Sequence, residues 1–220
     1  MADVVSAPAR LRFRLIGTWH PILLNDLSSS DLIKDFVRDV VGTRDQDATV
    51  RERLRRQFNE IIEQAVDGRA EAMFVVTEVR GAQIFATLTV RGVDDVRLSP
   101  AVGESPAEVM RVLIESLESL ERAGMDTAAV IDMGPSQALR LHRVREEEYD
   151  EGGEKFTSRT LNVDYWYTVP GTKELLLVNF ITPMGDIPNV MMAFFDSVVR
   201  ASYFDEAPDP QPQTSAESRR

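Results

Sequence analysis

The chain has 220 residues, of which 43% are hydrophobic and 28% are charged, the balance of an ordinary globular protein. Its formal net charge of −11 argues against binding to nucleic acid or to an anionic membrane, because an acidic surface is repelled by both. The absence of cysteine excludes disulfides and thiol chemistry and fits the reducing cytoplasm. No apolar run approaches the ~20 residues needed to cross a bilayer, so we expect no membrane insertion.

The N-terminal third is predicted to contain strands followed by two helices. Apolar and basic residues alternate over 10–16, which predicts a half-buried strand. Residues 17–21 are expected to interrupt it, because glycine and proline break regular structure, before a second short strand begins at Ile22. Apolar residues at helical spacing then predict helices over 30–41 and 47–66.

The middle of the chain combines a hairpin with a well-marked helix. Two alternating segments, 72–79 and 84–90, flank an Arg-Gly turn and predict a β-hairpin. Ser105 begins a capping box and is followed by proline at the first helical position. This pattern predicts a helix that starts there and ends near Gly124.

The C-terminal third is predicted to be mostly strands. Residues 127–133 and 138–144 form a strand pair around a Gly-Pro turn, and an acidic loop follows over 146–154. A long strand is expected over 157–169. Residues 175–181 are apolar on both faces, as in a central strand covered by helices on both sides. A proline then opens a last helix.

Hairpins that alternate with helices, in place of strict strand–helix–strand units, predict an α+β fold. We expect a largely antiparallel sheet covered by helices, similar to an α/β/α sandwich. Residues 10–204 are expected to form one domain, in which a weak break near 98–104 would separate two sub-halves. A short disordered lead, 1–9, and a disordered acidic, proline-rich tail, 205–220, are expected to flank it.

No group of residues has the spacing that catalysis, metal binding or phosphate binding requires. Ser136 follows a strand, as the serine of a nucleophile elbow does, but no histidine follows His142 to complete a triad. His20 is expected in a surface turn and His142 on the polar face of a strand. The acidic segment lacks the residue order of a calcium-binding loop. We therefore predict no catalytic residue, no metal and no cofactor.

Trp166 is the most suggestive local feature, because two tyrosines flank it on a strand and must face the opposite side. Asn162 and Asp164 share its face, which favours partial exposure of the indole ring. These three side chains, together with Trp19, are therefore candidate partner-binding residues. The alternative is that helices cover both faces of this strand and that Trp166 is a core residue.

The last third of the chain also resembles a known group of proteins. An aromatic strand, Val163-Asp164-Tyr165-Trp166-Tyr167, is followed by a Pro-Gly turn, an apolar strand at 175–180 and Phe194-Phe195-Asp196-Ser197-Val198 in the closing helix. This ending is similar to that of the Mog1/PsbP-like group over 160–204. The resemblance implies an α–β–α sandwich and a non-catalytic protein-binding module, such as an adaptor, a secretion-associated chaperone or a photosystem subunit. It implies no binding residue, because it does not extend to a site motif.

These observations favour a non-enzymatic cytoplasmic module that recognises a basic or apolar segment of a protein partner. One alternative is a hydrolase-like or transferase-like enzyme, whose candidate residues are Asp132, Asp164, Arg140 and His142. Another is a structural or regulatory protein that forms a homodimer through its Phe194-Phe195 face. A pocket that gathers the candidate carboxylates and histidine would favour the enzyme, whereas an open apolar concavity would favour binding.

Overall fold

The computed structural model describes most of the chain between residues 10 and 205. The described residues are 10–24, 34–35, 37–38, 41–44, 48–93, 103–151 and 154–205. The predicted lead, nearly all of the predicted tail and most of the predicted break and first helix therefore lie outside them.

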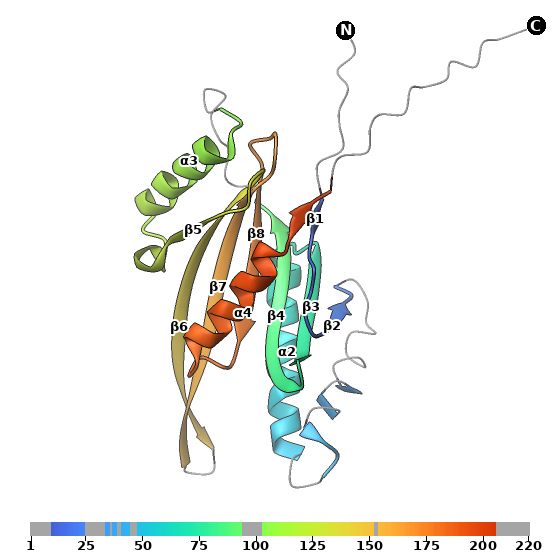
Figure 1. The fold of residues 1–220 in the computed structure, drawn as a ribbon. Helices are drawn as coiled ribbons and strands as arrows, with labels where there is room; N and C mark the ends of the chain where they lie inside the picture. The colour runs from blue at the N-terminus through green and yellow to red at the C-terminus, as the bar shows by residue number, and fades with distance from the viewer. Residues whose placement is uncertain are drawn as a thin grey trace, which may run out of the picture.

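The described elements form a large sheet with helices packed against its faces (Figure 1). In chain order they are β1 (Leu11–Arg12), β2 (Thr18–Ile22), α2 (Ala48–Asp67), β3 (Ala72–Val79), β4 (Ala82–Gly92), α3 (Pro106–Ser119), the 3-10 helix η2 (Met125–Thr127), β5 (Ala129–Asp132), β6 (Gln137–Glu151), β7 (Glu154–Thr168), β8 (Leu175–Thr182), α4 (Pro188–Arg200) and β9 (Tyr203–Phe204). Within these residues one seven-stranded sheet runs in the order β2-β3-β4-β8-β7-β6-β5, and β1 pairs separately with β9. Every pairing is antiparallel, which confirms the predicted α+β fold.

The sheet has helices on both faces. Helix α4 lies in front of it and α2 lies behind it in the view of Figure 1. We call these two sides the α4 face and the α2–α3 face. Helix α3 packs on the same side of the sheet as α2, because the strand residues beneath α2 and α3 alternate along each strand with the residues beneath α4. The strand predicted to be central, β8, lies between β4 and β7 and contributes buried side chains to both faces.

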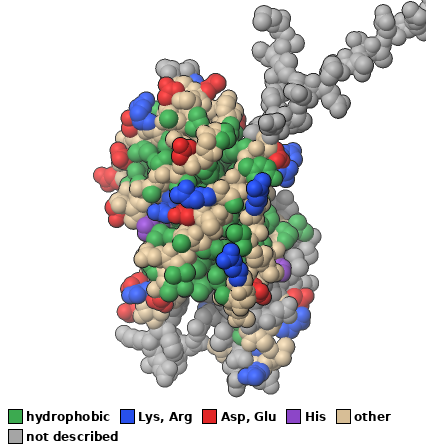
Figure 2. Space-filling model, in the orientation of Figure 1, with side chains coloured by type: hydrophobic (Ala, Val, Ile, Leu, Met, Phe, Trp, Pro, Cys, Tyr) green, Lys and Arg blue, Asp and Glu red, His purple; other side chains and the backbone are tan. Residues whose placement is uncertain are grey.

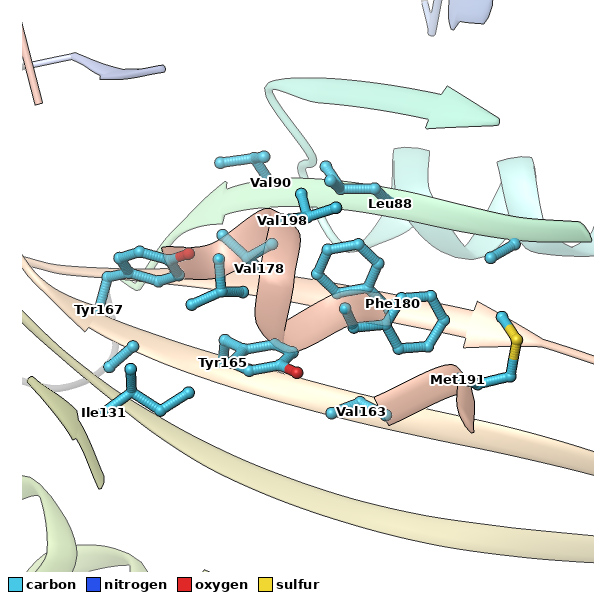
Figure 3. Close-up of a cluster of buried hydrophobic side chains, with 14 of the residues drawn as sticks. Leu88, Val90, Ile131, Val163, Tyr165, Tyr167, Val178, Phe180, Met191 and Val198 are labelled. Carbon is cyan, nitrogen blue, oxygen red and sulfur yellow. The ribbon is translucent and has the colours of Figure 1, made fainter. Parts of the chain in front are cut away.

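The core of the α4 face is continuous across the sheet. Tyr165, Tyr167 and Phe180 are fully buried there and point toward α4 (Figure 3). Phe195 of α4 stacks on Phe180 with ring centroids 4.5 Å apart. Alternation of apolar residues with a period of two supplies this layer, because successive side chains of a strand point to opposite faces.

The core of the α2–α3 face is divided into two clusters. Under α3, Trp166 packs with Leu113, Leu117 and neighbouring leucines of the sheet. Under α2, Phe58 packs with Met73, Val75 and the fully buried Val37. The part of the sheet between the two helices carries polar side chains, and this gap positions the site described below.

Helix α3 begins as its capping box predicts. Ser105 accepts a hydrogen bond from the Glu108 backbone N–H at 3.4 Å, and its hydroxyl donates to the Glu108 carboxylate at 2.6 Å. The helix ends at Ser119, earlier than predicted, and Leu120 just past its end is 75% exposed. Gly124 instead precedes η2 with φ +93°, a conformation that glycine adopts at little cost.

Further sequence-based predictions of local structure are wrong. A half-buried strand was expected over 10–16, yet only Leu11 and Arg12 of that range form a strand, and the strand expected to begin at Ile22 ends there. Residues 17–21 were expected to interrupt a strand, yet four of them belong to β2, where Pro21 lies on an edge strand and needs no ladder donor. The acidic segment was expected to be a loop, yet Glu146, Glu147 and Glu148 lie on β6 and pair with β7. Strand pairing continues there because outward-facing carboxylates are tolerated in a solvated two-stranded ribbon.

Candidate functional site

A groove of about 310 Å³ opens on the α2–α3 face, between α2 and the part of β6 that extends beyond β5. Its lining comes from α2, β4, β6, β7, β8 and the residue after β8. The lining residues are Phe58, Glu60, Ile61, Gln64, Phe85, Ala86, Thr87, Arg143, Arg145, Glu147, Thr160, Asn162, Ile181 and Pro183. A volume near 300 Å³ is at the small end of the range for ligand pockets.

Four lining residues form one row across four neighbouring strands. Thr87 pairs with Ile181, Ile181 pairs with Asn162, and Asn162 pairs with Arg143. Residues directly opposite one another in an antiparallel sheet point to the same face, so all four side chains project into or beside the groove. Strand pairing therefore fixes their spacing at about 5 Å from one strand to the next.

A chain of hydrogen bonds orients the Asn162 amide. The carboxylate of Asp164 accepts from the Asn179 side-chain nitrogen at 2.6 Å and from the Arg122 guanidinium at 3.4 Å. Because an ionised carboxylate only accepts, the Asn179 amide must present its nitrogen on this side. The same nitrogen donates to Oδ1 of Asn162 at 3.0 Å. The NH₂ group of Asn162 is consequently left as a donor toward the groove that this residue lines.

The Thr87 hydroxyl is the most unusual polar group of the groove. Thr87 is only 3% exposed, and its Oγ1 has no hydrogen-bond partner within the described residues. A buried hydroxyl in that state costs about 1–3 kcal/mol relative to a satisfied one.

The other side of the groove is apolar. Ile61 of α2 is half-buried there, and Phe58 beside it is 7% exposed. Phe85 and Ile181 contribute apolar surface from β4 and β8. The groove thus combines an apolar wall with a polar row, the combination that holds an apolar group in one orientation.

Trp166 lies where the alternative interpretation put it, in the core. Its side chain is 6% exposed beneath α3, so the expected partial exposure is wrong. The sequence argument failed because α3 covers this end of the strand but leaves the other end open. The guanidinium of Arg122 lies 5.8 Å from the ring centroid and closes its remaining edge. Trp166 therefore offers no surface anchor in this structure.

The other three candidate partner-binding residues are separated by the sheet. Asn162 lines the groove, and Asp164 adjoins it in the hydrogen-bond chain with a side chain 13% exposed. Trp19 lies on the α4 face at the edge strand β2, where its ring stacks on Phe194 at 6.2 Å. Its indole N–H donates to the Ile16 carbonyl at 2.9 Å. Trp19 and Asn162 cannot contact one ligand across the sheet.

The candidate residues of the enzyme alternative do not converge. Asp164 lies on the α2–α3 face, whereas Arg140 and His142 lie on the α4 face of β6. Asp132 ends the edge strand β5, and its carboxylate accepts from the Gly134 backbone N–H at 2.9 Å. Ser136 is 1% exposed and donates to the Thr168 carbonyl at 2.7 Å, a structural bond.

Arg140 instead takes part in a polar cluster that fastens α4 to the sheet. Its guanidinium pairs with the Asp196 carboxylate at 2.5 Å, and the Tyr165 hydroxyl donates to the same carboxylate at 2.7 Å. Burial and this hydrogen bond raise the pKa of Tyr165, so the hydroxyl keeps its proton and remains a donor. Nearby, burial and the charge of Arg140 lower the pKa of His142.

The Phe194-Phe195 face, predicted to mediate a homodimer, is largely covered: Phe194 is only partly exposed. Phe195 is fully buried, and Phe194 packs between it and Trp19. The apolar side chains that α4 does expose lie at its start, where Val190 is 61% and Ile187 is 42% exposed. Figure 2 shows this face, on which hydrophobic patches alternate with charged side chains. The homodimer itself stays a prediction.

Sequence reasoning missed the centre of the groove. The alternating pattern did not single out Thr87 of β4 or Arg143 of β6 as candidate site residues. A usable signal was present in β4, because a strand next to the centre of a covered sheet has both faces buried and its threonines need partners. The role of α2 as a wall required tertiary information.

The described residues lack two features that would indicate a membrane or metal-binding protein. None of the helices there combines the length and apolar character that crossing a bilayer requires. No three His, Cys, Asp or Glu side chains gather there into a group that would hold a metal ion.

Comparisons with known proteins give little further information. No family model matches the sequence, and no curated protein matches it. One solved structure is similar, that of LpqN from Mycobacterium tuberculosis, described as involved in cell envelope biogenesis. The similarity covers 93% of this chain and 87% of that chain at 10% identity, with a TM-score of 0.41. A score this low supports no argument about function.

Proposed function

We propose that this chain is a non-enzymatic protein-binding module, an adaptor or chaperone, whose groove on the α2–α3 face holds an apolar segment of a partner protein. The observation that carries the proposal is the groove itself, an open concavity with an apolar wall beside polar side chains, one of which, Thr87, has a hydroxyl with no partner within the described residues. Apolar surface at the bottom of a groove contributes about 25 cal/mol per Å² when a ligand removes it from water.

The mixed lining favours a peptide over a purely apolar ligand. Eight of the fourteen lining residues are polar, and two of these, Glu60 and Glu147, are acidic. Polar groups that surround an apolar wall lose water at a cost unless the ligand offers hydrogen bonds in exchange. A peptide backbone offers such bonds, and basic residues next to its apolar part would be attracted by the net charge of −11.

The proposal also covers the cellular location of the protein and its family. A cytoplasmic location is supported by the lack of cysteine, because the chain needs no oxidising compartment to fold. Membership of the Mog1/PsbP-like group is supported by the aromatic strand β7 and the closing helix α4, the elements on which the resemblance rests.

The proposal is tested by selecting random twelve-residue peptides against the full chain, from one phage library with free C-termini and one with both peptide ends fused. We expect enrichment of peptides that contain apolar residues. Ile61→Ser should weaken the selected peptides about tenfold, because it removes most of an apolar contact from the groove wall. Val66→Ser is the matched control, since Val66 is a 45% exposed residue of the same helix outside the groove.

Circular dichroism of both variants separates loss of binding from loss of folding. Failure to enrich any peptide from either library would contradict the proposal. So would selected peptides that bind folded Ile61→Ser as tightly as they bind the unaltered chain.

A further inference from the structure

We infer that the groove recognises the C-terminal end of its partner, with the free carboxylate held by Asn162 and Arg143. This inference rests on the proposed function and specifies the chemistry of the bound segment. The last apolar side chain packs against Phe58 and Ile61, and the backbone of the terminal residue meets Thr87. The donor groups of Asn162 and Arg143 favour this orientation, because they face the part of the groove where the carboxylate would lie.

The groove presents donors where the row of paired residues crosses it. The Asn179 side-chain nitrogen donates to both Asp164 and Oδ1 of Asn162. The NH₂ group of Asn162 is therefore the part of this amide left to donate to a ligand. Two amide N–H donors on one nitrogen, facing a groove, suit an oxygen ligand. A ligand that offered only donors there would leave both sides unsatisfied.

Arg143 adds a positive charge beside this amide. Arg143 on β6 pairs with Asn162 on β7, so the two backbones are about 5 Å apart and both side chains point to the same face of the sheet. Arg143 forms no ion pair within the described part of the chain. Arg145, two residues further along β6 on the same face, lies 3.6 Å from the Glu147 carboxylate. One of the two arginines is therefore available for an anion. A guanidinium and an amide together form a forked site for a carboxylate.

Thr87 sets how the rest of the terminal residue lies. It is two strands from Asn162, about 10 Å between backbones, so one carboxylate does not reach both side chains. The peptide unit that adjoins a terminal carboxylate spans the remaining gap. The Thr87 hydroxyl is buried in the free chain, so its bond to the ligand backbone requires the side chains that cover it to move aside.

The same features distinguish a protein C-terminus from a fatty acid. An alkyl chain needs a long apolar channel, but this groove is about 310 Å³ and its lining includes Glu60, Gln64 and Glu147. One apolar side chain with its peptide unit fits that space, and further backbone can leave past the polar rim. Capture of C-terminal carboxylates by backbone or side-chain donors is an established mode of peptide recognition.

The experiment uses the selected peptides from both libraries, resynthesised with a fluorescent label at the N-terminus. Each is made with a free C-terminal carboxylate and with a carboxamide, and fluorescence anisotropy gives Kd for the full chain. We expect the free-C-terminus library to supply the tightest binders, and amidation to weaken them at least tenfold, the loss of one charge-assisted hydrogen bond. Sodium decanoate is titrated in parallel as the fatty-acid probe.

Matched variants locate the effect. Arg143→Gln should weaken the free acid about tenfold and leave the amide unchanged, whereas Arg111→Gln, at an exposed arginine of α3 outside the groove, should change either by less than twofold. Asn162→Asp replaces donors by a negative charge and should abolish the preference for the acid. Peptides that bind equally well as acid and amide would overturn the inference while the proposed function stands. Decanoate that binds at Arg143 while no peptide is selected would overturn both.

Discussion

The two faces of the sheet differ in how completely the chain covers them. On the α4 face, one helix lies over a continuous core, and the Tyr165 hydroxyl beneath it bonds to Asp196, although Nε of Arg140 and Nδ1 of His142 have no hydrogen-bond partner within the described residues. On the α2–α3 face, two helices stand over separate clusters, and the gap between them exposes a groove with an unpartnered Thr87 hydroxyl. A fully covered face stabilises the fold, whereas a divided one leaves binding capacity.

Removal of one phenylalanine from each face tests this difference at the largest scale. Phe195→Ala should lower the free energy of unfolding by about 4 kcal/mol, because it opens a cavity in a closed core. Phe58→Ala should cost only about 2 kcal/mol, since the groove already borders the site and water can enter the new space. Urea denaturation measures both values, and equal losses would contradict the comparison.

Trp166 provides the next test, because it lies on the divided face but beneath α3. We expect Trp166→Ala to destabilise the chain by about 3 kcal/mol, close to the effect of other buried aromatic deletions. The affinity of groove-binding peptides should stay within twofold. If Trp166→Ala kept the stability of the unaltered chain but failed to bind peptide, Trp166 would be a partner-binding residue and this prediction would be wrong.

Two buried threonines allow a smaller and sharper comparison. The Thr182 hydroxyl donates to the Phe85 carbonyl and accepts from the Met184 N–H, so Thr182→Val should lose about 1–2 kcal/mol. Thr87→Val removes a hydroxyl that has no partner within the described residues and should stabilise the free chain by about 1 kcal/mol. The same Thr87→Val change should weaken peptide binding. Thermal unfolding and anisotropy together measure these opposite signs.

The smallest expected effect is a pH dependence from His142 on the α4 face. Burial, and then Arg140, lower its folded-state pKa below the ordinary value of 6.5. The unfolded chain therefore binds the proton first as the pH falls, and stability should decrease below about pH 6.5. His142→Gln should flatten this part of the stability curve. Urea midpoints measured from pH 7.5 to 5 check it, and an unchanged slope in the variant would exclude His142 as its source.

Local patterns predicted much of the architecture. The alternation in β3 and β4, the apolar β8 and the capping box at Ser105 each depend on neighbouring residues, and each is present in the structure. The candidate site was harder to predict, because its row joins Thr87 to Arg143 through the pairing of four strands. Register between distant strands is set by the packed sheet and is not readable from the spacing of residues.

The sequence also could not predict which parts of each sheet face the helices cover. Asn162 and Trp166 lie on one face of one strand, yet one lines an open groove and the other is in the core. Only the lateral position of α3 decides between these outcomes. The sequence shows that α3 exists, but it does not show which half of β7 the helix covers.

The extension of β6 beyond β5 has a consequence for the behaviour of the protein in concentrated solution. Strand β5 pairs with β6 only up to Arg140, and Thr127 then bonds the backbone N–H and carbonyl of His142. Past that point no described strand covers the outer edge, which is therefore a template for pairing with other chains. The exposed carboxylates of Glu146 and Glu148 along this edge repel an identical edge, and they thereby protect the ribbon against aggregation.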